Sequence, residues 1–524
     1  MFVVSDKLVF LITSVLAQAL RVITTFVMAR LLTPEDYGLL ALVGIAPGFL
    51  ALLGDCGITR ALVQYRDLPT ETVEASGLMV SVALAIFYAA LFFASGVFFF
   101  LHGYKHGSIL VRYDQRMVAV GLIAGMTVIL SAIYTFQMAC LNRDLKFRAE
   151  ALQNLIFAVV LAVTGLSLAL VAHHHRPFGV FAVAGQPLVA QIMGNAVIYH
   201  RHPFRWPSAF RFSMAAKMLN YGWRVTLAQY ANNLQQTIVA ASVSVVGGAY
   251  GLGVFGRATQ VSDMIGYSLV SSFDRLLHPL LRSVRDDAQR LRGIFTRGCI
   301  GTTLLCGFGW AWLMGTAPDL IRVVMGPQWG AVPPLLRIVC TVLLTSGAGL
   351  MAIVVTHALG KPLVWLRFGS VNLALLLAAL ASGLSWHRSL AAIAAAYAAC
   401  QATTAIAMNY WAARTLRVSV KTLGGHLARL LAVSLVTGFC ILQVRHWILW
   451  TPAVVRLIVA SLAGAAVFLI LALLVEREAI LDFRTLVRRR RPAEPPPPQT
   501  TEVPPPQNEL WNRRPEEVKS DGVV

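Results

Sequence analysis

Long apolar segments recur along almost the whole chain, each separated from the next by a short polar loop. A hydrocarbon layer of about 30 Å is crossed by roughly 20 helical residues, and these segments are long enough to do so. We therefore expect an all-α integral membrane protein with about 14 transmembrane helices. The approximate segments are 8–30, 37–56, 77–101, 117–139, 151–172, 178–199, 221–246, 253–277, 294–316, 332–355, 363–385, 390–412, 426–446 and 453–475.

The composition and the distribution of charge agree with this class. Of 524 residues, 57% are hydrophobic and 13% are charged. The net charge of +20 could indicate nucleic-acid binding, but the tail from Glu476 holds as many acidic as basic residues. The excess therefore lies in the membrane body, where it sets topology and attracts anionic headgroups. Membrane lipids are expected partners, and nucleic acid is not.

The loops predict the orientation in the membrane. Loops after even-numbered segments are rich in basic residues, such as Arg143, Lys146 and Arg148, whereas loops after odd-numbered segments are poorer, except around Lys105. Because cytoplasmic loops carry the positive excess, both termini of this multi-pass chain are expected in the cytoplasm.

Two short stretches recur at nearly one offset, which indicates an internal repeat. Leu16–Gln18 recurs as Leu227–Gln229, and Asp36–Leu39 resembles Ala249–Leu252, at a shift of 211–213 residues. Six predicted helices separate the copies, so both halves would enter the membrane in the same sense as a parallel pseudo-repeat; chance similarity is the alternative. The expected divisions are an amino lobe (1–210, helices 1–6), a carboxyl lobe (211–415, helices 7–12), an extra helix pair (416–476) and a disordered, proline-rich cytoplasmic tail (477–524).

Three of the predicted helices carry a polar stripe along one face, because residues spaced three and four apart share a face. The stripes are Ser14, Gln18, Arg21 and Thr25 in the first helix; Gln229, Asn232, Asn233 and Gln236 in the seventh; and Arg257, Gln260, Asp263, Tyr267, Ser271 and Asp274 in the eighth. Such stripes can be interhelical hydrogen-bond seams. Ionised groups inside a membrane, however, need water or partners, so Arg21, Arg257 and Asp263 favour a watered cavity between the lobes.

The predicted cavity suits an anionic, sugar-bearing ligand, because guanidinium groups bind phosphate oxygens and amides bind hydroxyls. The candidate substrate-binding residues are Gln18, Arg21, Thr25, Gln229, Asn232, Asn233, Gln236, Arg257 and Gln260. Asp263 is the candidate for coupling to H⁺, Na⁺ or the membrane potential, with a local salt bridge to Arg257 as the alternative. No spacing typical of a metal site or catalytic cluster occurs, so we expect no cofactor and no enzyme activity.

The opening of the chain resembles a known family. Arg30–Gly38 (RLLTPEDYG), followed by Ala61–Gln64 and Asp67–Leu68, is similar to the start of the bacterial polysaccharide transporters, the Wzx-like flippases of the multidrug/oligosaccharidyl-lipid/polysaccharide exporter superfamily. The resemblance implies a multi-pass protein of the bacterial inner membrane that moves an oligosaccharide on a polyprenyl diphosphate between leaflets by alternating access. It also implies a role in exopolysaccharide, capsule or O-antigen synthesis, with a polysaccharide polymerase and export proteins as candidate partners.

Two other functions compete with this interpretation. A drug or cation antiporter of the same superfamily would need carboxylates and aromatic rings in the cavity, because cations stack on aromatic faces; here the arginines match or outnumber the acids. A membrane polysaccharide polymerase or ligase would need a large extramembrane region or a convergent acid–base cluster. The internal loops offer neither.

Overall fold

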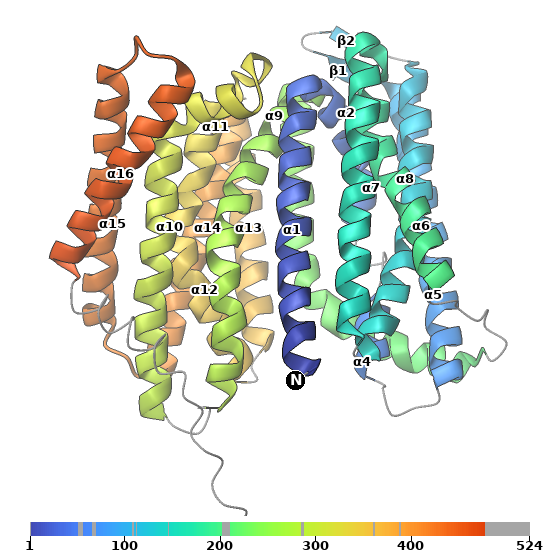
Figure 1. Ribbon diagram of the computed structural model, residues 1–524, viewed down its shortest axis with the longest axis horizontal. Helices are drawn as coiled ribbons and strands as arrows, with labels where there is room; N and C mark the ends of the chain where they lie inside the picture. The colour runs from blue at the N-terminus through green and yellow to red at the C-terminus, as the bar shows by residue number, and fades with distance from the viewer. Residues whose placement is uncertain are drawn as a thin grey trace, which may run out of the picture. The chain divides into compact units, whose positions relative to one another are not determined.

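The structure is a computed structural model that describes residues 2–50, 56–64, 70–106, 109–111, 113–144, 146–201, 210–283, 288–359, 362–386 and 389–476. These residues are almost entirely helical (Figure 1), which confirms the predicted all-α membrane class. Residues 1–480 form one compact unit. The tail predicted to be disordered, from 477 on, lies outside the described residues.

The first part of the chain contains short helices near the start and long ones after them. Its elements are α1 (Phe2–Leu31), α2 (Pro34–Val43), α3 (Ile45–Phe49), α4 (Ile58–Gln64), α5 (Thr70–His102), β1 (Tyr104–His106), β2 (Ile109–Val111), α6 (Gln115–Arg143), α7 (Phe147–His174) and α8 (Gly179–Arg201). Strands β1 and β2 form an antiparallel hairpin that pairs Lys105 with Leu110. We call the end of the bundle at which this hairpin lies, the top in Figure 1, the hairpin end.

The second part begins with α9 (Phe212–Ser283), in which two helices are joined at Gly248. The elements after it are α10 (Ala288–Val324), the short 3-10 turn η3 (Pro327–Trp329), α11 (Val332–Val339), α12 (Leu343–Ala358), α13 (Pro362–Trp386), α14 (Leu390–Thr415), α15 (Val420–Trp447) and α16 (Ala453–Val475). Helices α5–α8 and α10–α16 lie on opposite sides of α1 and α9 (Figure 1), and α9 packs against helices of both groups.

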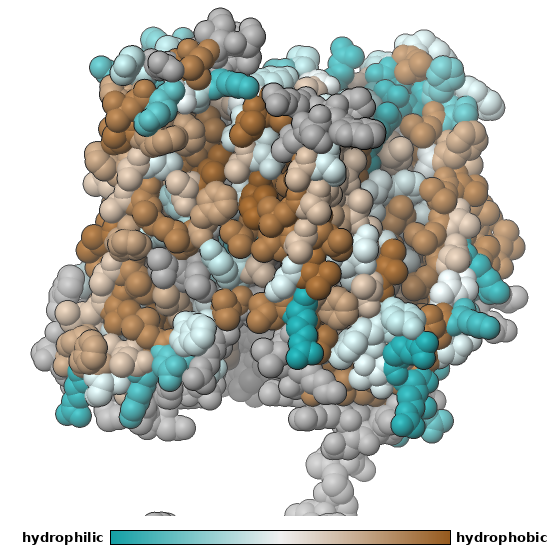
Figure 2. Space-filling view, turned by 180° about the vertical axis from the view of Figure 1, so that it is seen from behind, coloured by the Kyte–Doolittle hydropathy of each residue, from teal (hydrophilic) through white to brown (hydrophobic). Residues whose placement is uncertain are grey.

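Among the described residues, 11 helices are long and apolar enough to cross a membrane, so the expected number of about 14 is approximate. Three local features account for the difference. The segments expected at 221–246 and 253–277 lie on either side of the non-helical Gly248 but are counted once as α9, the segment at 37–56 is interrupted at Gly44, and the apolar part of α13 is short. Hydrophobic side chains cover the middle of the face in Figure 2, and hydrophilic ones gather mainly toward its ends, as a membrane-embedded bundle requires.

The turn from α1 into α2 is set by the sequence Thr33–Asp36. The Asp36 carboxylate accepts hydrogen bonds from the Thr33 backbone N–H at 2.9 Å and from the Thr33 hydroxyl at 2.7 Å. Pro34 occupies the first helical turn, where its missing N–H costs nothing. A threonine cap, a proline and an acidic residue three positions on therefore start α2 at a defined angle to α1.

Element α9 consists of two helices that meet at its glycine-rich centre. Gly248 has φ 60° and ψ −152°, a non-helical conformation that glycine adopts readily, and one helix lies on each side of this bend. Helix α2 packs closely against this bend: a Cβ at Gly38 would lie 1.7 Å from the Ala249 carbonyl oxygen, and one at Gly253 would lie 1.7 Å from the Pro34 carbonyl oxygen. The two copies of the recurring tetrapeptide thus lie against each other.

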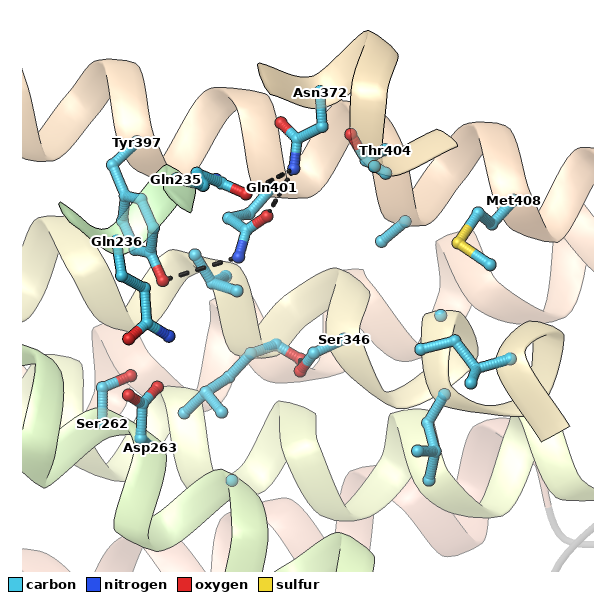
Figure 3. A pocket seen from close by; sticks show the side chains of 18 of the residues that line it. Gln235, Gln236, Ser262, Asp263, Ser346, Asn372, Tyr397, Gln401, Thr404 and Met408 are labelled. Carbon is cyan, nitrogen blue, oxygen red and sulfur yellow. Dashed lines mark hydrogen bonds between the residues drawn. The ribbon is translucent and has the colours of Figure 1, made fainter. Parts of the chain in front are cut away.

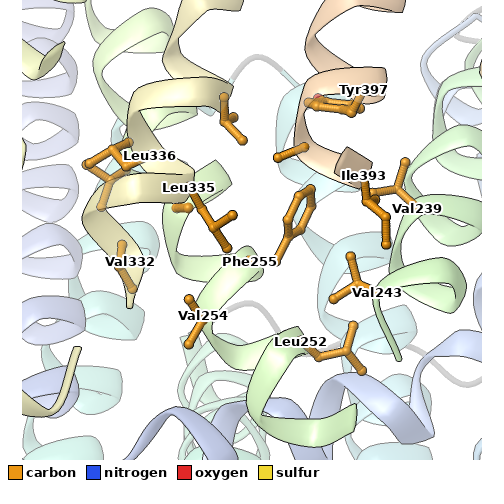
Figure 4. Close-up of a cluster of buried hydrophobic side chains, with 14 of the residues drawn as sticks. Val239, Val243, Leu252, Val254, Phe255, Val332, Leu335, Leu336, Ile393 and Tyr397 are labelled. Carbon is orange, nitrogen blue, oxygen red and sulfur yellow. The ribbon is translucent and has the colours of Figure 1, made fainter. Parts of the chain in front are cut away.

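A hydrophobic core surrounds the same bend (Figure 4). It joins both halves of α9 to α11 and α14 through Val239, Val243, Leu252, Val254, Phe255, Val332, Leu335, Leu336, Ile393 and Tyr397. At the hairpin end, the Lys105 ammonium group also donates a hydrogen bond to the Val245 carbonyl at 3.1 Å. The bend in α9 is therefore fixed by contacts with several elements. Residues of α9 on both sides of this bend line the cavities described next.

Candidate functional site

A cavity of about 550 Å³ lies between α1 and the second half of α9. Its lining residues are Gln18, Arg21, Val22, Thr25, Thr259, Gln260, Asp263 and Met264. The structure thus brings together the polar stripe predicted on the first helix and part of the stripe predicted on the eighth. We call it the α1–α9 cavity.

Arg21 supplies the positive charge of this cavity. Among the described residues its side chain has no hydrogen bond or ion pair, and its buried Nε atom has no partner. Its guanidinium carbon lies 5.9 Å from the centroid of the Phe157 ring. A guanidinium group so placed has unused hydrogen-bond donors, and these can bind an anion that enters the cavity.

Arg257 has a different environment. Its guanidinium carbon lies 3.7 Å above the Tyr37 ring and 6.0 Å from the Trp329 ring. It also donates a hydrogen bond to the side-chain oxygen of Gln260. Arg257 is buried and is not a lining residue of the α1–α9 cavity. In this conformation it forms a cation–π contact behind the cavity wall, and its role in substrate binding stays a prediction.

Asp263 lies where two cavities meet, because it lines the α1–α9 cavity and a second cavity within α9, α12, α13 and α14. Asp263 and Arg257, both described residues, form no direct ion pair, and Arg257 donates a hydrogen bond to Gln260. The carboxylate is therefore available inside the bundle, and its role in ion coupling remains a prediction. A salt bridge between Asp263 and Arg257 through water stays the alternative prediction.

The remaining predicted residues are scattered. Gln236 lines the second cavity, whereas Asn233 is exposed and lines neither of these two cavities. Ser14 is half-buried on α1, one turn before Gln18. The side chains of Gln229, Asn232, Tyr267, Ser271 and Asp274 lie outside the described part of the structure.

The second cavity, of about 480 Å³, contains polar residues that the sequence analysis missed (Figure 3). Gln235, Asn372, Tyr397 and Gln401 form a hydrogen-bonded group in its wall. Asn372 and Gln401 stand alone in strongly apolar segments, and an isolated amide in such a segment is the signal that could have identified them.

At the hairpin end, hydrogen bonds join the end of α1 to the last turn of α10 and to η3. The Trp329 indole N–H donates to the Ala29 carbonyl at 2.7 Å, and the Gln328 amide donates to the Arg30 carbonyl at 2.9 Å. The Arg30 guanidinium in turn donates to the Val323 carbonyl at 2.7 Å. These three bonds are called the α1–η3 clasp below.

A multi-pass helical bundle with polar cavities along its central helices is the architecture of a membrane transporter. Residues 27–334 match the family described as polysaccharide biosynthesis proteins. Since this match spans more than half of the chain, the protein belongs to that family.

Individual relatives agree with the family. The succinoglycan biosynthesis transport protein ExoT of Rhizobium meliloti (strain 1021) is 23% identical over 60% of this chain, and the matched part spans 61% of ExoT. The lipopolysaccharide biosynthesis protein WzxC of Escherichia coli (strain K12) is 23% identical over 64% of this chain, and the match spans 66% of WzxC.

Solved structures show the same fold. The lipid II flippase MurJ in an inward closed conformation has a TM-score of 0.66, 13% identity, and coverage of 92% of this chain and 100% of MurJ. An inward-facing multidrug resistance MATE family transporter has a TM-score of 0.60, 15% identity, and coverage of 78% of this chain and 96% of that transporter. The chain therefore belongs to the polysaccharide biosynthesis family and has the fold of these solved transporters.

Proposed function

We propose that this protein moves polyprenyl-diphosphate-linked oligosaccharides from the cytoplasmic to the periplasmic leaflet of the bacterial inner membrane, for exopolysaccharide, capsule or O-antigen synthesis. The observation that carries this proposal is the guanidinium of Arg21 in the α1–α9 cavity, which has no hydrogen-bond or ion-pair partner among the described residues. The named relatives in polysaccharide biosynthesis support it. A polysaccharide polymerase and export proteins are the partners expected for such an activity.

The energetics favour a diphosphate as the ligand of Arg21. An arginine in a membrane segment costs about 2.5–3.5 kcal/mol on insertion scales, and an anionic ligand compensates this cost directly. The guanidinium fork can bind two phosphate oxygens at once, while Gln18, Thr25 and Gln260 provide hydrogen-bonding groups for adjacent hydroxyls. The lipid tail would stay in the bilayer beside α1.

The proposed transport cycle is alternating access between two lobes. We place the amino lobe at residues 1–210, the carboxyl lobe at 211–415 and the extra helix pair at 416–476. With both termini in the cytoplasm, the hairpin end faces the periplasm, and the α1–η3 clasp closes the cavity on that side. Release of the substrate would then require the clasp to open.

A cation or drug antiporter is the second candidate function, and Asp263 is the observation that favours it. Its carboxylate is accessible to both cavities and lies in an ion pair with no described residue. We assign Asp263 instead to coupling with H⁺, Na⁺ or the membrane potential, because Arg21 in the same cavity would repel a cationic substrate. Efflux of a cationic dye driven by Na⁺ or H⁺ in proteoliposomes would reverse this assignment.

The test of the flippase function is the substitution Arg21→Ala in proteoliposomes loaded with a fluorescent polyprenyl-diphosphate oligosaccharide. Loss of a charge-assisted hydrogen-bonding group should weaken binding about 10- to 100-fold and reduce transport accordingly. Arg21→Lys keeps the charge but not the guanidinium fork, so its transport rate should lie between those of the wild type and Arg21→Ala. Arg201→Ala, at an exposed position at the end of α8, is the matched control. Wild-type transport by Arg21→Ala would refute the proposed mechanism.

A further inference from the structure

The second cavity differs from the α1–α9 cavity in its charge. None of its described lining residues is an arginine or lysine, and Asp263 is its single carboxylate. The other polar lining groups are amides and hydroxyls: Gln235, Gln236, Asn372, Gln401, Tyr397, Ser262, Ser346 and Thr404. Apolar side chains such as Leu343, Ile353 and Met408 complete the wall. This combination suits a neutral ligand that is rich in hydrogen-bonding groups and also has an apolar face.

The amides of this cavity hold one another in fixed orientations (Figure 3). The Asn372 amide N–H₂ donates to the Gln401 side-chain oxygen at 2.7 Å and to the Gln235 side-chain oxygen at 3.2 Å. The Gln401 amide donates to the Tyr397 hydroxyl at 3.5 Å. Because Gln235 and Asn372 are each only 4% exposed, this network is part of the packed wall and is formed before any ligand arrives.

The network engages two of the amide oxygens that a cation could use as ligands. The side-chain oxygens of Gln235 and Gln401 already accept hydrogen bonds from Asn372. A cation here would therefore depend on other oxygens of the cavity, above all the Asp263 carboxylate. Gln235 Nε2 and Asn372 Oδ1 have no partner among the described residues, and both atoms are buried in the wall. A sugar hydroxyl both donates and accepts hydrogen bonds, so it can pair with the accessible amides and hydroxyls that line the cavity, such as Gln236.

The position of the cavity fits a sugar as well as its chemistry does. Asp263 lines both cavities, so the second cavity adjoins the one that contains Arg21. In a lipid-linked oligosaccharide, the sugars follow directly on the diphosphate. A volume of about 480 Å³ is within the range of cavities that enclose small ligands.

We infer that the second cavity is the subsite for the uncharged sugar residues of the transported lipid, while the diphosphate binds at Arg21. This inference rests on the proposed function and adds to it a recognition site in the carboxyl half. Gln236 and Gln401 are the residues assigned to direct contact with sugar hydroxyls, since both line the cavity and are accessible from it.

The test compares two probes on the full chain in lipid nanodiscs. One is polyprenyl diphosphate without sugar, and the other is the lipid-linked repeat unit extracted from cells that produce this protein. Gln236→Leu is the principal variant, because Gln236 makes no hydrogen bond with another described residue and its replacement leaves the amide network intact. Gln443→Leu, at an exposed position of α15, is the matched control.

We expect Gln236→Leu and Gln401→Leu to weaken binding of the glycosylated probe about tenfold and to leave binding of the bare carrier unchanged. Arg21→Ala should weaken binding of both probes to the same extent. Equal affinities of the wild type for the two probes, or equal losses for both probes in the glutamine variants, would overturn the sugar subsite alone. If the wild type binds neither probe, both the sugar subsite and the proposed function are overturned.

A third measurement addresses the cation alternative. Thermal unfolding of the wild type is followed with NaCl and with choline chloride at equal ionic strength. The inference predicts the same midpoint in both salts. A higher midpoint in NaCl than in choline chloride that disappears in Gln401→Leu would identify a cation site in this cavity. It would refute the assignment to sugar.

Discussion

Buried charges in this protein fall into two kinds at the scale of single residues. Arg21 has unused donors in a cavity, whereas Asp319 on α10 is only 2% exposed and is fully paired. The Asp319 carboxylate accepts a hydrogen bond from the Arg445 guanidinium of α15 and forms an ion pair with Arg456 of α16 at 2.8 Å. The first kind is available for a ligand, and the second holds the extra helix pair to the bundle.

The Asp319 cluster gives a prediction of stability. Asp319→Asn leaves two arginines without their counter-charge, and breaking a buried pair in this way costs about 3–5 kcal/mol. Thermal unfolding of the purified protein should therefore begin at a clearly lower temperature. Asp144→Asn removes an exposed pair with Lys146 and should cost less than about 1 kcal/mol. Equal midpoints for the two variants would show that the buried cluster is not a structural support.

At the scale of elements, the crossing of α2 over the bend in α9 depends on two glycines. A methyl group at Gly38 would lie 1.7 Å from a backbone oxygen, which no rotamer change can relieve. We expect Gly38→Ala to destabilise the protein by at least about 1–3 kcal/mol, the usual cost of overpacking.

Gly256→Ala is the matched control for this crossing, because it lies on α9 with no atom within 4 Å of its added Cβ. In a helix, replacing an unrestricted glycine by alanine should stabilise by about 0.5–1 kcal/mol. Opposite signs for the two alanine variants, measured by chemical or thermal unfolding in detergent, are the expected result. The same sign for both would contradict the close crossing.

The local stability of the β-hairpin is expected to depend on pH through Asp114, which caps α6. Burial raises the pKa of this carboxyl, but hydrogen bonds from Arg116 and from the Tyr104 hydroxyl outweigh it and hold the pKa below its ordinary value. A carboxyl whose pKa is lowered by folding stabilises the folded state at pH values above its ordinary pKa of about 3.9. This stabilisation is lost as the pH falls through the folded-state pKa. The protection factor for hydrogen exchange at β1, which corrects for the intrinsic exchange rate at each pH, should therefore fall in acid, and Asp114→Asn should show the lower protection factor already at pH 7.

The sequence predicts elements better than it predicts contacts between them. Apolar runs define most spans, because burial in lipid needs only length and composition. The glycine-rich stretch between the segments at 221–246 and 253–277 marks the break at Gly248, because glycine adopts the non-helical backbone conformation found there. Stripe spacing correctly places Gln18, Arg21 and Thr25 on one cavity-facing side of α1.

Contacts between residues far apart in the sequence could not be predicted in this way. The hydrogen bond between Asn372 and Gln235 joins residues 137 positions apart. No periodicity within one helix predicts such a partner. The same holds for the stacking of Arg257 on Tyr37, which turns a predicted cavity residue into a buried contact.

At the scale of the whole molecule, the α1–η3 clasp joins the end of α1 to α10 and η3 at the hairpin end. If the proposed cycle is correct, the clasp must break once per transported lipid. Cysteines at Arg30 and Gln328, in a background without the native cysteines, can be joined by a short bis-maleimide, because the Gln328 amide contacts the Arg30 carbonyl at 2.9 Å. Cross-linked protein should still bind the lipid-linked probe but should not transport it.

The controls for this experiment are the two single-cysteine variants treated with the same reagent. Both should transport, because a reagent attached at one end leaves α1 and η3 free to separate. Loss of binding in the cross-linked protein would mean that the reagent distorts the cavity, and normal transport would mean that this end does not open. Only retained binding with abolished transport matches alternating access, because it separates occupation of the cavity from release at the hairpin end.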